Sequence, residues 1–188
     1  QGLRRNFFKK IDRLLVLASS KTFADSPSQI SYLVDQRVAK NNGISILGSG
    51  SISGVNLERF KSNPQIRDHL RSKHGANEET CVYLFVGRLC KDKGVLDLIQ
   101  AFKQIDQASG RAALWIVGPD EEGIQALVNQ NLDLLSSNIV WVGPTFSPEH
   151  YMAAADVLVL PSYREGFGSV IIEAAACGLP AIAYRIPG

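Results

Sequence analysis

The feature that most constrains the fold is a regular alternation of apolar runs with helical patterns, which begins at Cys81. Residues 82–86 and 112–117 are almost continuously apolar, as expected of strands buried on both faces of a sheet. Between them, residues 94–108 carry an apolar stripe at helical spacing. Strands that alternate with helices form β-α-β units. We therefore predict an α/β fold with a doubly wound, Rossmann-like parallel sheet of about five strands.

The same kinds of pattern predict the other strands and helices. We expect strands over 44–47, 82–86, 112–117, 138–142, 156–160 and 181–184, and helices over 3–18, from Pro27, and over 94–108, 121–136, 148–155 and 169–177. Residues 71–80 are polar and indicate a surface loop. Ligands of such sheets bind at the carboxyl ends of the strands, where the strand order reverses. The turns after Val86, Val117, Val142 and Leu160 are therefore the candidate site.

Composition excludes several classes of protein. With 188 residues, 45% of them hydrophobic and 20% charged, the chain is typical of an ordinary globular domain rather than a disordered or fibrous one. The net charge of +2 is too small to indicate nucleic-acid binding. No run of 18 apolar residues is present, so the sequence predicts no membrane span.

The cysteines and histidines indicate neither a disulfide framework nor a metal site. Cys81, Cys90 and Cys177 are odd in number and far apart, which is typical of free thiols in a reducing compartment, and we expect a cytoplasmic protein. His69 and His74 have no acidic or cysteine partner at metal-ligand spacing, so we expect both on the solvated surface.

Residues 3–18 form a basic amphipathic pattern that has two interpretations. Apolar residues at helical spacing lie opposite a set of arginines and lysines. Such a helix packs its apolar face on protein, which we favour, or lies on the inner face of an anionic membrane as a peripheral contact.

Residues 48–54 are rich in Gly and Ser and follow an expected strand, as a phosphate-binding turn would. However, their spacing is not G-x-G-x-x-G, and no long helix opens directly after them. We favour a flexible connector, followed by a brief turn over 56–60.

The turn after Val86 suits a diphosphate. Residues 87–94 (GRLCKDKG) place Arg88 and Lys93 between a strand end and a helix start. A helix start presents unpaired N–H groups and the positive end of its dipole, and cations beside it add to the attraction for an anion. A solvated charged loop is the alternative interpretation.

The turn after Leu160 combines two glycines with two carboxylates. Residues 161–173 (PSYREGFGSVIIE) contain Gly166 and Gly168, which allow close approach of a ligand, and then Ser169, a candidate helix cap. Glu165 precedes the helix and Glu173 lies within it, so both can point into the crevice. A salt bridge or a capping contact of Glu173 is the alternative, because an unpaired carboxylate is costly to bury.

Together these segments resemble the donor-binding half of a GT-B-fold retaining glycosyltransferase of family four, the glycosyl transferases group 1. The resemblance covers roughly residues 22–188. It rests on an intact E-x7-E donor signature at 165–173 and on segments 87–94, 117–118, 156–162 and 176–180. Residues 47–60 resemble the interdomain connector, and their Gly-Ser-Gly-Ser form is most similar to the capsule and O-antigen branch of bacterial enzymes.

The resemblance implies a role for each site residue. Arg88 and Lys93 would hold the diphosphate and stabilise the leaving nucleotide. Glu165 would bind hydroxyls of the transferred sugar, and Glu173 would bind the ribose. The positions around them that would contribute to the donor site are Gly118, Pro119, Val142, Gly143, Pro144, Thr145, Gly166, Phe167, Gly168 and Ser169. The resemblance implies no metal or other cofactor, and a UDP-hexose or UDP-N-acetylhexosamine as donor.

The resemblance also implies a division of the chain. Residues 1–47 would be a remnant of an N-terminal acceptor domain, and residues 48–188 a donor-binding domain truncated at its C-terminus. Family members are longer, so we expect a fragment that is inactive alone, because a saccharide or lipid-linked acceptor would bind the missing domain. The alternatives are a GT-B-fold epimerase or phosphorylase and a non-catalytic nucleotide-binding partner domain.

Overall fold

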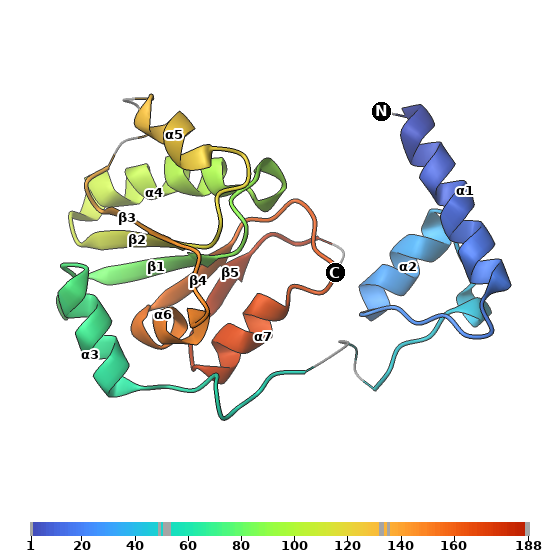
Figure 1. Ribbon diagram of the computed structural model, residues 1–188, viewed down its shortest axis with the longest axis horizontal. Coiled ribbons are helices and arrows are strands. Elements are labelled where there is room, and N and C mark those ends of the chain that lie inside the picture. Colours follow the sequence, from blue (N-terminus) through green and yellow to red (C-terminus); the bar gives the residue numbers. More distant parts are fainter. Residues whose placement is uncertain (1, 49, 51–53, 132–133, 135, 187–188) are drawn as a thin grey trace. The chain divides into compact units, whose positions relative to one another are not determined.

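The computed structural model describes residues 2–48, 50, 54–131, 134 and 136–186 (Figure 1). The chain divides into two compact units. One comprises Gln1–Gly54, Glu165–Gly168 and Ile186–Gly188, and the other comprises Val55–Arg164 and Ser169–Arg185. Most of residues 48–54, predicted as a flexible connector, lie outside the described residues.

The second unit is built on a parallel sheet. Its described strands are five, in the order β3-β2-β1-β4-β5. They are β1 (Cys81–Val86), β2 (Ala112–Val117), β3 (Ile139–Gly143), β4 (Val157–Leu160) and β5 (Ala181–Ala183). All four pairings are parallel, with β1 in register with β2 from Cys81–Ala112 to Val86–Val117. The predicted α/β class and parallel sheet are confirmed.

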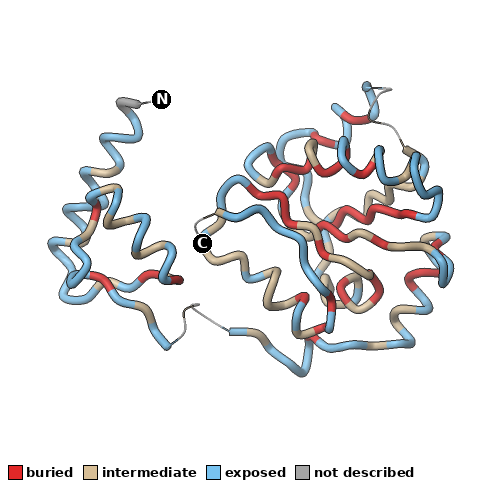
Figure 2. Tube along the Cα trace, turned by 180° about the vertical axis from the view of Figure 1, so that it is seen from behind, coloured by how far each residue is buried: buried red, intermediate tan, exposed pale blue. Residues whose placement is uncertain are grey.

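Helices cover both faces of this sheet (Figure 1). One face carries α3 (Pro64–Lys73), α6 (Pro148–Ala154) and α7 (Ser169–Ala176), and the other carries α4 (Val95–Ser109) and α5 (Ile124–Asn129). β2 is buried along its whole length, which explains its unbroken apolar sequence. Figure 2 shows that the buried residues are concentrated in the strands and the helix faces against them.

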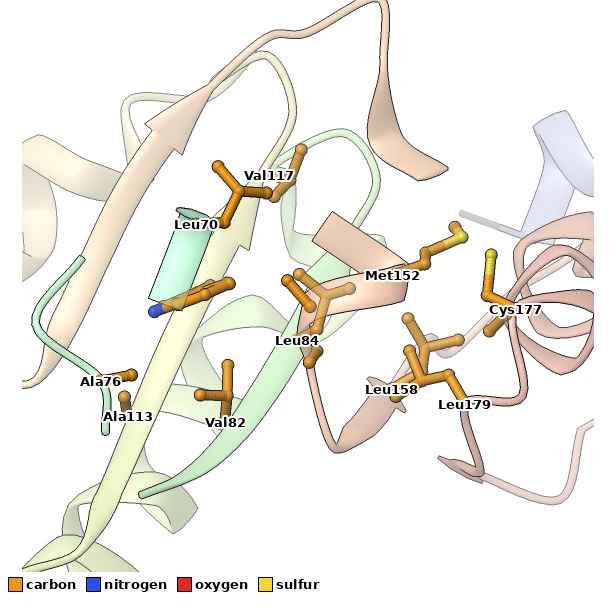
Figure 3. Close-up of a cluster of buried hydrophobic side chains, with 14 of the residues drawn as sticks. Leu70, Ala76, Val82, Leu84, Ala113, Val117, Met152, Leu158, Cys177 and Leu179 are labelled. Atoms are coloured by element: carbon orange, nitrogen blue, oxygen red, sulfur yellow. The ribbon is translucent and has the colours of Figure 1, made fainter. Parts of the chain in front are cut away.

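Each face has its own apolar cluster. Figure 3 shows the cluster under α3, α6 and α7, where Leu84 and Leu158 of the sheet lie close to Met152 of α6 and to Cys177, which directly follows α7. The opposite cluster packs Phe85 and Leu114 against α4 and α5. Burial is complete along the central β2, whereas all three residues of the edge strand β5 are exposed.

In the first unit, α1 (Gly2–Ala18) and α2 (Pro27–Asp35) pack through polar groups. Ser26 caps α2 by accepting a hydrogen bond from the N–H of Gln29 (3.1 Å), as the Ser-Pro sequence predicted. Arg5 and Lys9 of α1 both donate to Oε1 of Gln36, at 3.0 and 2.5 Å. The apolar side chains of α1, by contrast, are largely exposed.

Three predictions about secondary structure were wrong. Residues 44–47 form no strand in the described part of the chain; Ser45 makes an isolated bridge to Phe23. Among the described residues of 121–136, the α-helix is α5 alone, and it begins at Ile124, where Asp120 accepts from the N–H groups of Ile124 (2.8 Å) and Gln125 (2.9 Å). The polar segment expected as a loop contains the end of α3, which begins after the cap residue Asn63.

His74 is not on the solvated surface. Its ring lies 5.1 Å from that of Trp115 and 6.1 Å from that of Tyr151, in the cluster beneath α3 and α6. Within the described residues, its Nε2 is buried and has no hydrogen-bond partner. Burial, with a smaller contribution from Lys73, lowers the pKa of His74. His69 is exposed, as predicted. Cys81, Cys90 and Cys177 are free thiols.

Candidate functional site

The strand order reverses between β1 and β4. From β1 the chain moves outward to β2 and β3, then returns to the other side of β1 with β4 and β5. In a doubly wound sheet, ligands bind in the crevice outside the carboxyl ends of the strands at such a reversal. At these ends lie the turn after β1, with Arg88 and Lys93, and the turn after β4, which leads toward the two carboxylates.

The turns after β1 and β2 are in direct backbone contact. Gly118 has a φ of 141°, and a Cβ placed on it would lie 1.8 Å from the carbonyl oxygen of Gly87. The N–H of Gly87 donates to the carbonyl of Val117 (3.0 Å), and that of Leu89 to the carbonyl of Pro119 (2.8 Å). Glycine is therefore required at 118 by both conformation and space.

The turns after β1 and β4 also meet. Gly94 has a φ of 66°, and a Cβ there would lie 2.1 Å from the carbonyl oxygen of Pro161. The N–H of Tyr163 donates to the carbonyl of Asp92 (2.9 Å), and the Tyr163 hydroxyl donates to the Asp97 carboxylate. Arg164 lies 3.7 Å from the Asp92 carboxylate. The short helix that carries Lys93 (η2, Lys91–Lys93) is thus fixed against the turn after β4.

The two predicted cations lie on this turn in different settings. Arg88 pairs with Glu121 at 2.8 Å, and both side chains are more than two-fifths exposed. An ion pair this exposed contributes little stability, so the guanidinium can exchange Glu121 for an anionic ligand. Lys93 is half-buried and lies directly before the N-terminus of α4. Glu121 was not predicted, because nothing in its sequence neighbourhood identifies a partner 33 residues away.

Glu173 lies within α7 and is half-buried. Burial raises the pKa of its carboxyl group, Arg59 opposes that change, and Glu149 adds to it. The charge of Glu173 is therefore influenced by a cation and a second carboxylate that the sequence pattern did not identify. Arg59 and Glu149 are themselves paired at 2.8 Å.

The remaining predicted site residues lie at and after the end of β3 and in the turn before α7. Val142 and Thr145 lie at the end of β3, where the Thr145 hydroxyl accepts from the N–H of Ser147 (3.1 Å). Ser169 is the first residue of α7, so the position before the helix belongs to Gly168, with a φ of 72°. Glu165, Gly166, Phe167 and Gly168 belong to the first unit, whereas the other predicted site residues belong to the second.

The described residues contain no group of three or more His, Cys, Asp or Glu side chains able to hold a metal ion. None of their helices combines the length and the apolar character needed to cross a membrane.

Comparisons with known proteins agree with this geometry. The sequence profile of the family Glycosyl transferases group 1 matches residues 66–188. The chain is 31% identical over 180 residues to the capsular polysaccharide biosynthesis glycosyltransferase CapM of Staphylococcus aureus, covering 95% of this chain and 47% of that protein. It is 30% identical over 135 residues to the putative teichuronic acid biosynthesis glycosyltransferase TuaC of Bacillus subtilis (strain 168), covering 72% and 32%. The chain thus spans about half the length, or less, of these curated relatives.

Solved structures share the fold. Sucrose-phosphate synthase from Thermosynechococcus elongatus matches with a TM-score of 0.77 and 29% identity, over 96% of this chain and 44% of that one. HepE of Anabaena, crystallised with UDP-glucose, matches with a TM-score of 0.78 and 23% identity, over 98% and 51%. Both likenesses extend over nearly all of this chain and about half of the other.

Proposed function

Because the chain belongs to the glycosyl transferases group 1 family, we propose that it provides the nucleotide-sugar-binding half of a retaining glycosyltransferase. The donor is a UDP-hexose or UDP-N-acetylhexosamine. The enzyme transfers the sugar to a saccharide or lipid-linked acceptor in bacterial surface polysaccharide synthesis, in the cytoplasm. The observation that carries the proposal is the reversal of strand order between β1 and β4, where the turn that carries Arg88 and Lys93 packs against the turn after β4.

The chemistry expected at this reversal is mainly electrostatic. Arg88 and Lys93 bind the diphosphate and stabilise the charge that develops on the departing UDP, with the N–H groups at the start of α4 nearby. Glu165 binds hydroxyls of the sugar, with the backbone of Gly166, Phe167 and Gly168. Two cations beside a helix N-terminus supply the positive charge that a diphosphate needs, so the proposal includes no metal cofactor.

Glu173 is assigned to the ribose hydroxyls, and the turns at Gly118–Pro119 and Val142–Thr145 to the base. Homologous UDP-bound structures such as that of HepE support a UDP donor. Transfer itself requires the acceptor to be held beside the donor. We therefore expect donor binding, rather than turnover, to be the measurable activity of these 188 residues.

The ribose assignment is tested by calorimetry with UDP on the chain and on Glu173→Ala. We expect binding to weaken roughly tenfold or more, because two hydrogen bonds to a charged group are lost. Glu79→Ala, at an exposed carboxylate paired with Arg111, is the control. Equal heats for the native chain and the Glu173 variant would exclude the ribose role.

The diphosphate assignment is tested by comparing UDP with uridine. Arg88→Gln and Lys93→Gln should each weaken UDP about tenfold and leave uridine nearly unchanged, because only UDP carries the charge they bind. Arg111→Gln is a matched control, since Arg111 is also an exposed arginine paired with a glutamate, but at the amino end of β2. Equal loss of both ligands would contradict the assignment.

A peripheral membrane contact through residues 3–18 is a separate part of the proposal. Phe7 and Phe8 on α1 are 61% and 57% exposed, which supports it. Co-sedimentation with vesicles containing an anionic phospholipid, compared with neutral vesicles, tests it. Unchanged partitioning in Phe7→Ser/Phe8→Ser would refute the contact.

A further inference from the structure

Arg59 is held in a fixed position by its own short segment. The side-chain oxygen of Asn56 accepts from the N–H groups of Glu58 (3.0 Å) and Arg59 (3.3 Å), and the N–H of Phe60 donates to the carbonyl of Asn56 (2.9 Å). Phe60 is 7% exposed and belongs to the cluster beneath α6 and α7. The turn and this buried ring therefore fix the backbone from which Arg59 extends.

The guanidinium of Arg59 joins this segment to the loop after β3 and to α6. Its Nη2 donates to the carbonyl of Phe146 (2.6 Å) and to the carboxylate of Glu149 (2.8 Å). The Glu149 side chain is only 11% exposed, although that of Arg59 is 44% exposed. A carboxylate so far removed from water needs its cation, so this pair is more than a surface contact.

Glu149 and Glu173 are two carboxylates that influence each other. Each raises the pKa of the buried thiol of Cys177, after burial itself, and Glu149 raises the pKa of Glu173. Arg59 is the charge that opposes this effect on Glu173, and both carboxylates in turn raise the pKa of Arg59. The charged groups that act on Glu173 are thus Arg59 from the segment before α3 and Glu149 from α6, with the Cys177 thiol one turn along α7.

We propose that Arg59 is a positioning residue for the nucleoside end of the donor site. It holds the loop after β3 through the Phe146 carbonyl and pairs with Glu149, and so sets the charge around Glu173. The inference deepens the proposed function and rests on it, because Glu173 and the loop at 142–145 are the groups assigned to ribose and base. Arg59 acts through them and need not touch the donor.

Removing Arg59 and removing the charge of Glu149 should have opposite effects on the ionisation of Glu173. Without Arg59, Glu149 is left unpaired beside Glu173, so the Glu173 carboxylate is harder to ionise. Without the charge of Glu149, Arg59 is free to favour the ionised form of Glu173. A purely structural brace would instead weaken binding in both variants in the same way.

The experiment is calorimetry of the full 188-residue chain with UDP between about pH 5 and pH 8, a range that lies above the ordinary carboxyl pKa. UDP binding should weaken as the pH falls, since a protonated Glu173 is a poorer acceptor. The midpoint of that loss should move to higher pH in Arg59→Gln and to lower pH in Glu149→Gln. In the double variant it should return toward the native midpoint. At pH 7, Arg59→Gln should weaken UDP roughly three- to tenfold, and Arg59→Lys should restore the midpoint.

Lys61→Gln is the matched control. Lys61 lies two residues after Arg59, and its Nζ is 3.7 Å from the carboxylate of Glu58 on the exposed surface. This variant should leave the midpoint unchanged. If the native chain binds UDP and the two variants shift the midpoint in the same direction, or not at all, the inference is wrong and the proposed function stands. If the native chain binds no UDP at any pH, the proposed function fails. In that case the charge coupling is tested without UDP, by NMR titration of the Glu173 carboxyl group, whose signal is assigned by its loss in Glu173→Gln. The titration midpoint should again move in opposite directions in Arg59→Gln and Glu149→Gln.

Discussion

Helices α1 and α4 have similar amphipathic sequences but very different surroundings. In α4, Ile99 and Phe102 are at most 1% exposed, because they pack on the sheet of the second unit. In α1, Phe7 and Leu15 are each 61% exposed, and contacts to α2 are made by arginine and lysine on the opposite side of the helix. The same periodicity therefore predicts a helix in both cases, but it does not predict what covers the apolar face.

The difference follows from where stability originates. Most helical stability in proteins comes from packing an amphipathic face, and little of it comes from intrinsic propensity. The second unit supplies such packing on both sides of its sheet, whereas the first unit relies on polar contacts that water weakens. We therefore expect equivalent substitutions to have large effects in the second unit and small effects in the first.

The largest effect is expected for Arg71→Met. The buried guanidinium donates to the Asp156 carboxylate (2.9 Å) and to the carbonyls of Asn77 and Thr80 (both 2.6 Å). Its removal takes one of the two arginines from Asp156 and the guanidinium donor from both carbonyls, and should lower the free energy of unfolding by about 3–5 kcal/mol. Urea unfolding followed by circular dichroism measures this. In the first unit, Arg13→Met removes one bond from an exposed guanidinium to the carbonyl of Arg37 and should cost less than about 0.5 kcal/mol.

Asp156 gives the same network a pH dependence. Burial raises the pKa of this carboxyl, but its bonds from the N–H of Val82 and from Arg67 and Arg71 outweigh burial, so the pKa is lowered overall. The stability it contributes is therefore present above the ordinary carboxyl pKa and is lost as the pH falls through the lower folded value. Arg71→Met should reduce this acid sensitivity; an unchanged slope of stability with pH would show that Arg71 does not hold Asp156 ionised.

Ile99→Ala and Leu15→Ala compare the two helices directly. Ile99 is fully buried, so its truncation should cost about 2–4 kcal/mol through lost contacts and a residual cavity. Leu15→Ala should change the free energy of unfolding by less than about 0.5 kcal/mol, because its side chain already contacts water. A large loss from Leu15→Ala would mean that the apolar face of α1 is covered in solution.

Much of the second unit could be predicted because its signals are local. Buried parallel strands are continuous apolar runs, and the turns after them are located by the same pattern. The strand order could not be predicted, since it depends on pairing between residues far apart in sequence, such as Tyr83 with Val157. The Asn63-Pro64 start of α3 was overlooked although Ser26-Pro27 was recognised by the same signal.

The residues of the candidate site could also be predicted only in part. Arg88, Lys93 and Glu173 could be found because they lie within motifs attached to predicted strands. Their partners Glu121, Arg59 and Glu149 could not, since each approaches from a different turn and has no spacing that identifies it. A motif thus predicts which side chains carry chemistry, whereas the charges that tune them depend on the tertiary fold.

An intermediate effect is expected for Gly94→Ala, at the contact between the turns after β1 and β4. The new methyl would combine a left-handed backbone with overlap against the Pro161 carbonyl, at a cost of about 2–3 kcal/mol. Gly123 in the second unit and Gly48 in the first have φ values of 69° and 54° and open space around them, so alanine there should cost only about 1 kcal/mol. Urea unfolding of the three variants measures the difference, and equal costs would show that the two turns do not touch.

The smallest effect is expected for His74→Gln. Together with His69→Gln it compares how two histidines, one in α3 and one directly after it, affect the pH dependence of stability. Burial lowers the pKa of His74, so the unfolded chain takes up a proton more readily than the folded one below about pH 6.5. Folding stability should therefore fall as the pH is lowered from about 7 to 5, with a small contribution from this group. His74→Gln should remove that part of the loss, whereas His69→Gln, at an exposed position, should leave the profile unchanged. Identical profiles for the His74 variant and the native chain would mean that the ring is solvated, because only a histidine shielded from water resists protonation in this way.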